Sequence, residues 1–177
     1  LFSPSFVFYL PSAVHCQAEN SGNNFESLKA NVKVFGGKWY FEVVLLTYGS
    51  IRIGWAKEGA NLATDVTIFL FFSCQLTFPS FSSIFLINFI LISNKKKAPL
   101  GNDENSWAFD GSTQKTFHGG NGVRYGEYWG NADIIGCVLD LEARTISYYR
   151  NGNDLGVAFS NVDAAAGLSP AFSLSRK

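Results

Sequence analysis

The chain has 177 residues, enough for one domain with a hydrophobic core and short for two. Its 14 Lys and Arg residues balance 14 Asp and Glu residues, which disfavours binding to a polyanion, and we expect no nucleic-acid partner. With 47% hydrophobic and 16% aromatic residues, the chain is too apolar to be disordered.

The first 23 residues predict a leader of uncertain order. Residues 1–18 carry no Lys, Arg, Asp or Glu, as in the apolar part of a secretory signal. However, Pro4 and Pro11 interrupt the apolar run and no basic segment precedes it, so we do not expect a signal peptide. Met is absent from the whole chain, from which we expect a segment of a longer protein.

Short strands are predicted on both sides of a long apolar stretch. Before it, residues 39–46 are rich in aromatic and β-branched side chains, and apolar residues alternate with Arg52 over residues 51–55. The turn residues between these two runs predict a hairpin over residues 46–52. After it, residues 101–175 contain short apolar runs separated by turn signals such as Asn151-Gly152. No capped segment of helical period appears there, so the predicted fold class is all-β, closed as a sandwich.

The apolar stretch itself interrupts this pattern. Residues 66–94 contain no charged side chain and are long enough to cross a bilayer, with three lysines following at 95–97. A span between two halves of one sheet would place those halves on opposite sides of the membrane. We therefore interpret residues 66–99 as an apolar insert, and since its composition is what translation of an AT-rich intron gives, we expect it to be a retained intron. A genuine loop insertion and a membrane span at 66–94 are the alternatives.

Seven segments in order carry a resemblance to a known family: GKWYFEV, IRIGWA, DENSWAFDG, YGEYW, DIIGCVLDL, TISYYRNG and LGVAF. The series resembles the SPRY domain, the core of the B30.2 module, over residues 24–65 and 101–175. This resemblance implies a bent sandwich of two antiparallel sheets over residues 24–175, interrupted by the insert. It also implies a module that binds a short peptide segment or a surface of another protein through loops at one edge. Similar domains occur in large ubiquitin ligases, so recruitment of a ligase substrate is a second interpretation.

Residues suited to catalysis or metal binding are scattered. His15 and His118 have no Ser, Cys or carboxylate at a spacing typical of a triad or a metal site. The acidic residues between 103 and 140 lack the alternating pattern of a calcium loop. The three cysteines have no C-x-x-C spacing and indicate a reducing compartment. We predict no enzymatic activity, no metal and no cofactor, and a location in the cytoplasm or nucleus.

The predicted binding residues lie at the rim of the sandwich. Tyr128 and Trp129 sit beside Gly126 and Gly130 near a turn, where a partly exposed aromatic side chain can anchor a partner peptide. Core packing is the competing role for the tryptophans. Polar residues expected to contact the same protein or peptide ligand are Lys57, Asp103, Glu104, Asn105 and Arg124. No oligomeric state is predicted.

Overall fold

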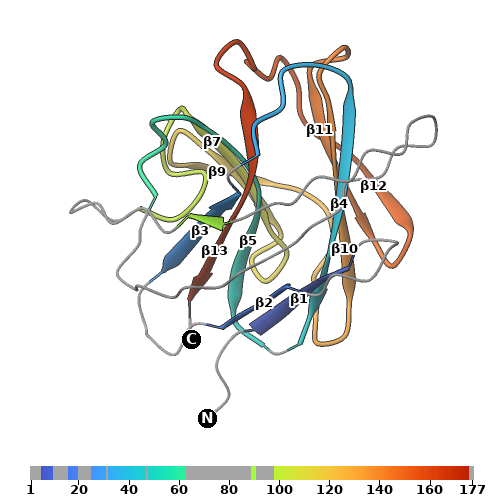
Figure 1. The fold of residues 1–177 in the computed structure, drawn as a ribbon. Coiled ribbons are helices and arrows are strands. Elements are labelled where there is room, and N and C mark those ends of the chain that lie inside the picture. The colour runs from blue at the N-terminus through green and yellow to red at the C-terminus, as the bar shows by residue number, and fades with distance from the viewer. Residues whose placement is uncertain are drawn as a thin grey trace.

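In the computed structural model, the chain forms two antiparallel β-sheets that stack as two layers (Figure 1). The structure describes residues 5–9, 16–19, 25–30, 32–46, 48–62, 89–90 and 98–175, and these contain no helix. The six-stranded sheet has the order β12-β11-β10-β4-β1-β2, and the seven-stranded sheet has the order β6-β3-β13-β5-β7-β8-β9. The predicted all-β sandwich is therefore confirmed.

The strand bounds are as follows: β1 (Ser5–Tyr9), β2 (Cys16–Glu19), β3 (Glu26–Ala30), β4 (Lys38–Leu45), β5 (Ser50–Lys57), β6 (Phe89–Ile90), β7 (Ser106–Asp110), β8 (Lys115–His118), β9 (Asn121–Arg124), β10 (Ile134–Asp140), β11 (Thr145–Arg150), β12 (Asn153–Phe159) and β13 (Leu168–Ser175). The predicted leader contributes β1 and β2, and β1 pairs with β4.

Two consecutive hairpins, β10–β11 and β11–β12, form where the turn signals predict them. Asn151 and Gly152 have φ angles of 51° and 81°, and two successive positive φ angles are what a type I′ turn requires. In the preceding turn, Asp140 Oδ1 accepts hydrogen bonds from the backbone N–H groups of Glu142 and Ala143 at 3.1 and 2.8 Å. Local side-chain chemistry therefore determines both turns.

The hairpin predicted over residues 46–52 is wrong. The strand before it, β4, pairs with β1 and β10 in one sheet, whereas β5 pairs with β7 and β13 in the other. The segment between β4 and β5 therefore crosses from one layer to the other. The turn residues correctly indicate that the chain changes direction, but the hydrogen-bonding partners of both strands come from distant parts of the sequence.

Aromatic side chains fill the space between the layers. Phe41 of β4 packs against Trp55 of β5 and Phe172 of β13, with ring centroids 5.4 Å apart in both pairs. The hydroxyl group of Tyr148, from β11, donates a hydrogen bond of 2.8 Å to the carbonyl oxygen of Ile53 in the opposite sheet. These contacts give the two sheets a fixed relative position, and this rigid body supports the surface loops.

A second apolar cluster covers the outer face of the seven-stranded sheet. Leu100 is fully buried there among Leu62 and three alanines, Ala56, Ala108 and Ala171. The backbone N–H of Leu100 donates a hydrogen bond of 2.8 Å to Ser173 Oγ. The segment from residue 98 to 102 therefore lies on the sheet, and the central strand β5 is buried on both faces.

The two ends of the apolar insert lie next to each other. Leu62, just before it, forms a parallel β-bridge with Ala98 near its end. Within the described part of the chain, no helix is long and apolar enough to cross a membrane. The predicted span at 66–94 falls outside the described residues apart from β6, which pairs with β3.

Deleting residues 66–97 is expected to leave the domain folded. Residues 63–65 then have to connect Leu62 to Ala98, and three residues span up to about 10 Å, whereas paired chains lie only about 4.8 Å apart. The deletion keeps Leu100 in its cluster and removes β6 from the sheet edge. Urea unfolding followed by circular dichroism should give a midpoint at or above that of the full chain.

A matched deletion of residues 66–102 also removes the segment that covers the outer face, and it should lower the midpoint strongly. Equal loss of structure in both deletion variants would contradict the expectation. In the native protein, mass spectrometry of tryptic peptides tests the intron interpretation, because detection of the peptide that contains residues 66–94 would rule it out.

Candidate partner-binding surface

The predicted binding residues are divided between the two ends of β5. Lys57 ends this strand, next to the turn that contains residues 103–105. Tyr128 and Trp129 lie at the other end, near Gly49 and Ile51. The six residue steps from Ile51 to Lys57 span about 20 Å in an extended strand. A short ligand that contacts one group therefore leaves most of the other untouched.

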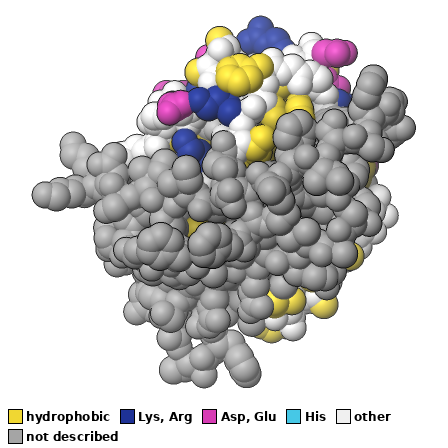
Figure 2. All heavy atoms as spheres, viewed as in Figure 1, with side chains coloured by type: hydrophobic (Ala, Val, Ile, Leu, Met, Phe, Trp, Pro, Cys, Tyr) yellow, Lys and Arg dark blue, Asp and Glu magenta, His cyan; other side chains and the backbone are white. Residues whose placement is uncertain are grey.

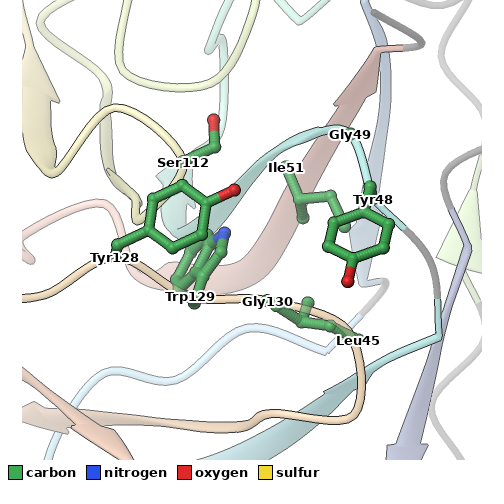
Figure 3. A pocket seen from close by; sticks show the side chains of 8 residues that line it. All are labelled: Leu45, Tyr48, Gly49, Ile51, Ser112, Tyr128, Trp129 and Gly130. Carbon is green, nitrogen blue, oxygen red and sulfur yellow. The ribbon is translucent and has the colours of Figure 1, made fainter.

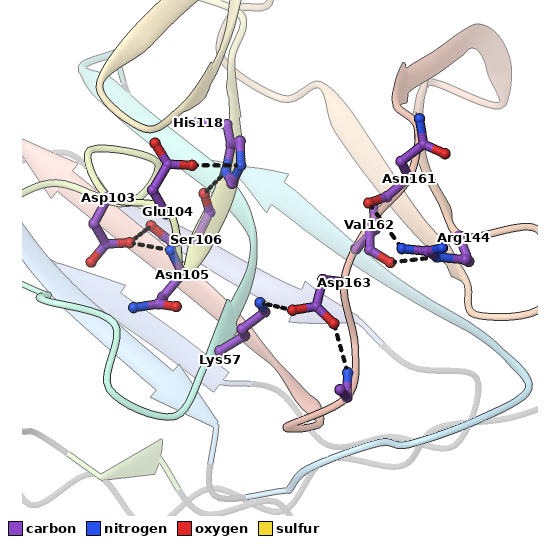
Figure 4. Close-up of polar contacts among 11 residues, drawn as sticks. Lys57, Asp103, Glu104, Asn105, Ser106, His118, Arg144, Asn161, Val162 and Asp163 are labelled. Carbon is purple, nitrogen blue, oxygen red and sulfur yellow. Dashed lines mark hydrogen bonds and ion pairs between the residues drawn. The ribbon is translucent and has the colours of Figure 1, made fainter.

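The first group, which we call the polar end, lies at the top of Figure 1, where β13 begins. Lys57 forms an ion pair with Asp163 (Figure 4), and its backbone N–H donates to the carbonyl oxygen of Asn105 at 2.8 Å. Asp103 Oδ1 accepts hydrogen bonds from the backbone N–H of Asn105 at 3.0 Å and from Ser106 Oγ at 2.7 Å. These groups hold their own turn together.

Glu104 belongs to the same turn and contacts His118. Its Oε2 lies 3.3 Å from Nε2 of His118, whose Nδ1 lies 2.9 Å from the carbonyl oxygen of Ser106 (Figure 4). The His118 ring stacks on Trp107 with a centroid distance of 4.7 Å and an interplanar angle of 9°. His118 thus ends β8 as a packed side chain between two neighbours.

The polar end exposes both apolar and charged side chains. Phe35 is 67% exposed there, beside the ion pair between Lys33 and Glu58. Figure 2 shows hydrophobic side chains among Lys or Arg and Asp or Glu side chains at the same end. Because Lys33 pairs with Glu58 and Lys57 pairs with Asp163, a charged ligand at this end would compete with existing ion pairs.

Most aspartates in the second half of the chain stabilise turns through side-chain hydrogen bonds. In each case the carboxylate accepts a hydrogen bond from the backbone N–H two residues later, which is the geometry of an Asx turn. The five pairs and their distances are Asp103–Asn105 (3.0 Å), Asp110–Ser112 (2.9 Å), Asp140–Glu142 (3.1 Å), Asp154–Gly156 (2.8 Å) and Asp163–Ala165 (3.1 Å). Asx turns therefore give Asp103, Asp110 and Asp140 a structural role, whereas Glu104 contacts His118.

The second group surrounds a small depression that we call the aromatic hollow (Figure 3). Two exposed tyrosines flank it: Tyr48 is 72% exposed and Tyr128 is 54% exposed. Trp129, only 3% exposed, forms part of its wall. The full lining is Leu45, Tyr48, Gly49, Ile51, Ser112, Tyr128, Trp129 and Gly130.

Trp129 is held in the core by close packing. Its ring lies so near Gly111 that a Cβ at that position would be 2.3 Å from the indole, and it contacts Phe109 with a centroid distance of 4.7 Å. Tyr128 therefore offers a partner far more side-chain surface than Trp129 does. Arg124 ends the neighbouring strand β9 opposite Lys115 and does not line the hollow.

A charged network fixes the loop that carries Tyr128. Asp133 accepts hydrogen bonds from the backbone N–H of Gly130 at 2.7 Å, from Arg150 Nε at 2.9 Å and from the side chain of Asn151 at 2.7 Å. Burial acts to raise the pKa of Asp133, but these hydrogen bonds outweigh it and hold the pKa below its usual value. Arg150 also pairs with Glu127 at 3.1 Å. The loop is therefore positioned before any ligand arrives.

Sequence reasoning missed Tyr48 and Ser112 as parts of this surface. Tyr48 stood in a segment interpreted as a hairpin turn, and Ser112 lies in the turn between β7 and β8. The exposed aromatic residue beside Gly49 was the available signal for Tyr48. No comparable signal marks Ser112.

Two stacked antiparallel sheets with preformed loops at both ends define a β-sandwich recognition domain. The profile of the SPRY domain family matches residues 38–177, and the chain belongs to this family, whose members are protein-interaction modules. It is 30% identical over 155 residues to the E3 ubiquitin-protein ligase RKP of Arabidopsis thaliana, covering 86% of this chain and 10% of that protein. It is also 30% identical over 157 residues to the ATP-dependent RNA helicase Ddx1 of Drosophila melanogaster, covering 88% of this chain and 16% of the helicase. The chain therefore spans a small part of these relatives.

Proposed function

We propose that this SPRY domain binds a short segment of a partner protein at the aromatic hollow, with Tyr128 as the apolar anchor. The observation that carries the proposal is the pair of exposed tyrosines beside the hollow, of which Tyr128 stands on the loop that the Asp133 network already fixes. Because the loop is ordered beforehand, binding loses little conformational entropy. Aromatic side chains at the centre of an interface contribute a large share of its free energy.

The polar end is the alternative docking surface. Its predicted residues Lys57, Asp103, Glu104 and Asn105 are engaged in contacts within the domain, which favours the hollow. Arg124, at the hollow end, is exposed and is proposed as a polar contact at its edge. The two ends are distinguishable by mutation because each carries an exposed aromatic side chain.

Replacing Tyr128 by Ala is expected to weaken peptide binding by at least fivefold, about 1 kcal/mol. The ligand for this test is a peptide selected from a random phage-displayed library against the whole chain. Isothermal titration calorimetry then gives the affinities of the parent chain and its variants. Since the Tyr128 side chain is more than half exposed, its removal should leave the unfolding midpoint unchanged.

The matched control is Phe35→Ala, which removes an exposed aromatic side chain from the polar end. This substitution should leave the affinity for the selected peptide within twofold of that of the parent chain. A loss with Phe35→Ala but not with Tyr128→Ala would move the binding site to the polar end. If the library yields no peptide, recognition of a short segment by this domain is refuted.

A role in recruiting substrates to a ubiquitin ligase is a second candidate, favoured by the similarity to the ligase RKP. A ligase domain in the same full-length protein would support it. Such a role, like binding to an intracellular partner in general, fits the proposed cytoplasmic or nuclear location. The balanced charge still favours a protein partner over a nucleic acid.

A further inference from the structure

The indole N–H of Trp129 lacks a hydrogen-bond partner among the described residues, although the side chain is 97% buried. Buried indole groups normally donate to an acceptor, because an unpaired buried donor destabilises the fold. Trp39, which is only half-buried, has such an acceptor, since its Nε1 donates to the carbonyl oxygen of Gly36 at 2.7 Å. Trp55 Nε1 also has no hydrogen-bond partner among the described residues, but its indole lies in the core against the thiol of Cys137. The Trp129 indole differs from both because it borders the aromatic hollow.

The unpartnered nitrogen is closed off from solvent, and the indole that carries it forms part of the wall of the hollow. In Figure 3 the nitrogen lies on the edge of the indole nearest Tyr128 and Ser112. The Ser112 hydroxyl already donates to Asp110 Oδ1 at 2.7 Å. The Tyr128 hydroxyl has no hydrogen bond to the described residues, and its ring is 54% exposed, so the side chain is free to turn aside.

The lining of the hollow restricts what can accept this hydrogen bond. None of its eight residues is charged, so a carboxylate or phosphate would lose hydration without gaining a cation. The hollow is small and partly open to solvent, and the centre of a water-sized group can occupy about 20 Å³ of it, which is room for one small polar group. A neutral carbonyl oxygen meets both conditions, and an extended polypeptide presents one at every residue.

We propose that the aromatic hollow receives a main-chain carbonyl group of the partner peptide, which accepts a hydrogen bond from Trp129 Nε1. Tyr128 turns aside to admit the carbonyl and then packs, with Tyr48, on the neighbouring part of the peptide. This inference rests on the proposed function and deepens it. It predicts that the domain recognises backbone at this point and apolar side chains on either side of it.

The first test follows the Trp129 indole resonance in the ¹⁵N-labelled chain by NMR. The probe is N-methylacetamide, a neutral amide of the size of one peptide group, and sodium acetate is the charged comparison. We expect the amide to shift the Trp129 indole proton downfield in a saturable manner, while the other three indole resonances stay in place. An equal or larger effect of acetate, or no effect of the amide, overturns the inference.

The second test uses Trp129→Phe, which removes the donor and keeps an aromatic ring. With a library-selected peptide, we expect about a tenfold loss of affinity, whereas the control variant Trp39→Phe should bind like the parent chain. Peptide binding that depends on Tyr128 but not on the Trp129 donor refutes the carbonyl contact and leaves the proposed function standing. If Trp129→Phe unfolds, the NMR titration of the parent chain still decides whether Trp129 Nε1 donates to a neutral carbonyl group.

Discussion

Replacing Gly54 by Ala is expected to destabilise the domain by at least about 3 kcal/mol, a large part of the total for a domain of this size. Gly54 lies in the middle of β5, which pairs with β13 on one side and β7 on the other. An added Cβ would lie 1.9 Å from the carbonyl oxygen of Trp107 and 3.1 Å from the Cα atom of Ala108. Both neighbours are backbone atoms, so the clash cannot be relieved by turning a side chain.

The reason for the size of this effect is the position of β7. It lies between β5 and β8, and its side chains Trp107 and Phe109 pack in the core. Moving its backbone away from Gly54 would therefore disturb the sheet and the core together. We expect little folded protein at room temperature, measured by far-ultraviolet circular dichroism and urea unfolding.

Gly36→Ala is the matched control. Gly36 is exposed, has no atom within 4 Å of an added Cβ and has no positive φ angle. This substitution should change the free energy of unfolding by less than about 0.5 kcal/mol. If Gly54→Ala is as stable as Gly36→Ala, the close approach of β5 and β7 is refuted.

Sequence patterns predicted the strands and turns well because those depend on neighbouring residues. Asn151-Gly152 adopts the positive φ angles its turn needs, and both hairpins around it form as expected. The order of strands in a sheet depends on contacts between distant segments. For that reason the same kind of local evidence assigned β4 and β5 to one hairpin, although they belong to different sheets.

Burial was predicted less well than strand position. The alternation of Arg52 with apolar residues indicates a strand with one solvent-facing side, yet Arg52 is only 8% exposed. Residues 98–102 cover that side, and nothing local in β5 reveals a segment that joins from almost fifty positions away. The candidate site was predicted incompletely for the same reason. Tyr128 was recognisable as an aromatic residue in a loop, whereas its neighbour Tyr48 comes from a distant part of the chain.

Replacing Arg52 by Ala is expected to lower the free energy of unfolding by about 2–4 kcal/mol. Arg52 Nη1 donates hydrogen bonds to the carbonyl oxygen of Leu100 at 2.8 Å and to Asn102 Oδ1 at 3.0 Å. Its guanidinium carbon lies 3.7 Å from the ring centroid of Phe117 and 5.3 Å from that of Phe25. Removal leaves a buried carbonyl without its donor and a void between two rings.

The loss of hydration on burying the Arg52 guanidinium opposes the stabilisation that these contacts provide. It lowers the pKa of the guanidinium, an effect that the nearby Asp110 carboxylate partly offsets. The charge is retained because arginine deprotonates only at very high pH. We expect the contacts to outweigh the desolvation, since they hold residues 98–102 against the sheet and so keep Leu100 in its cluster.

The measurements are urea unfolding and amide hydrogen exchange. Arg124→Ala removes an exposed arginine and is the control, expected within about 0.5 kcal/mol of the parent chain. Arg52→Lys keeps the charge but not the planar group that stacks on Phe117, so it should fall between the two. Exchange at residues 98–102 should accelerate in Arg52→Ala and not in Arg124→Ala. If both alanine variants are equally stable, Arg52 does not fasten this segment, and the covering of the outer face must depend on Leu100 and the Ser173 hydrogen bond alone.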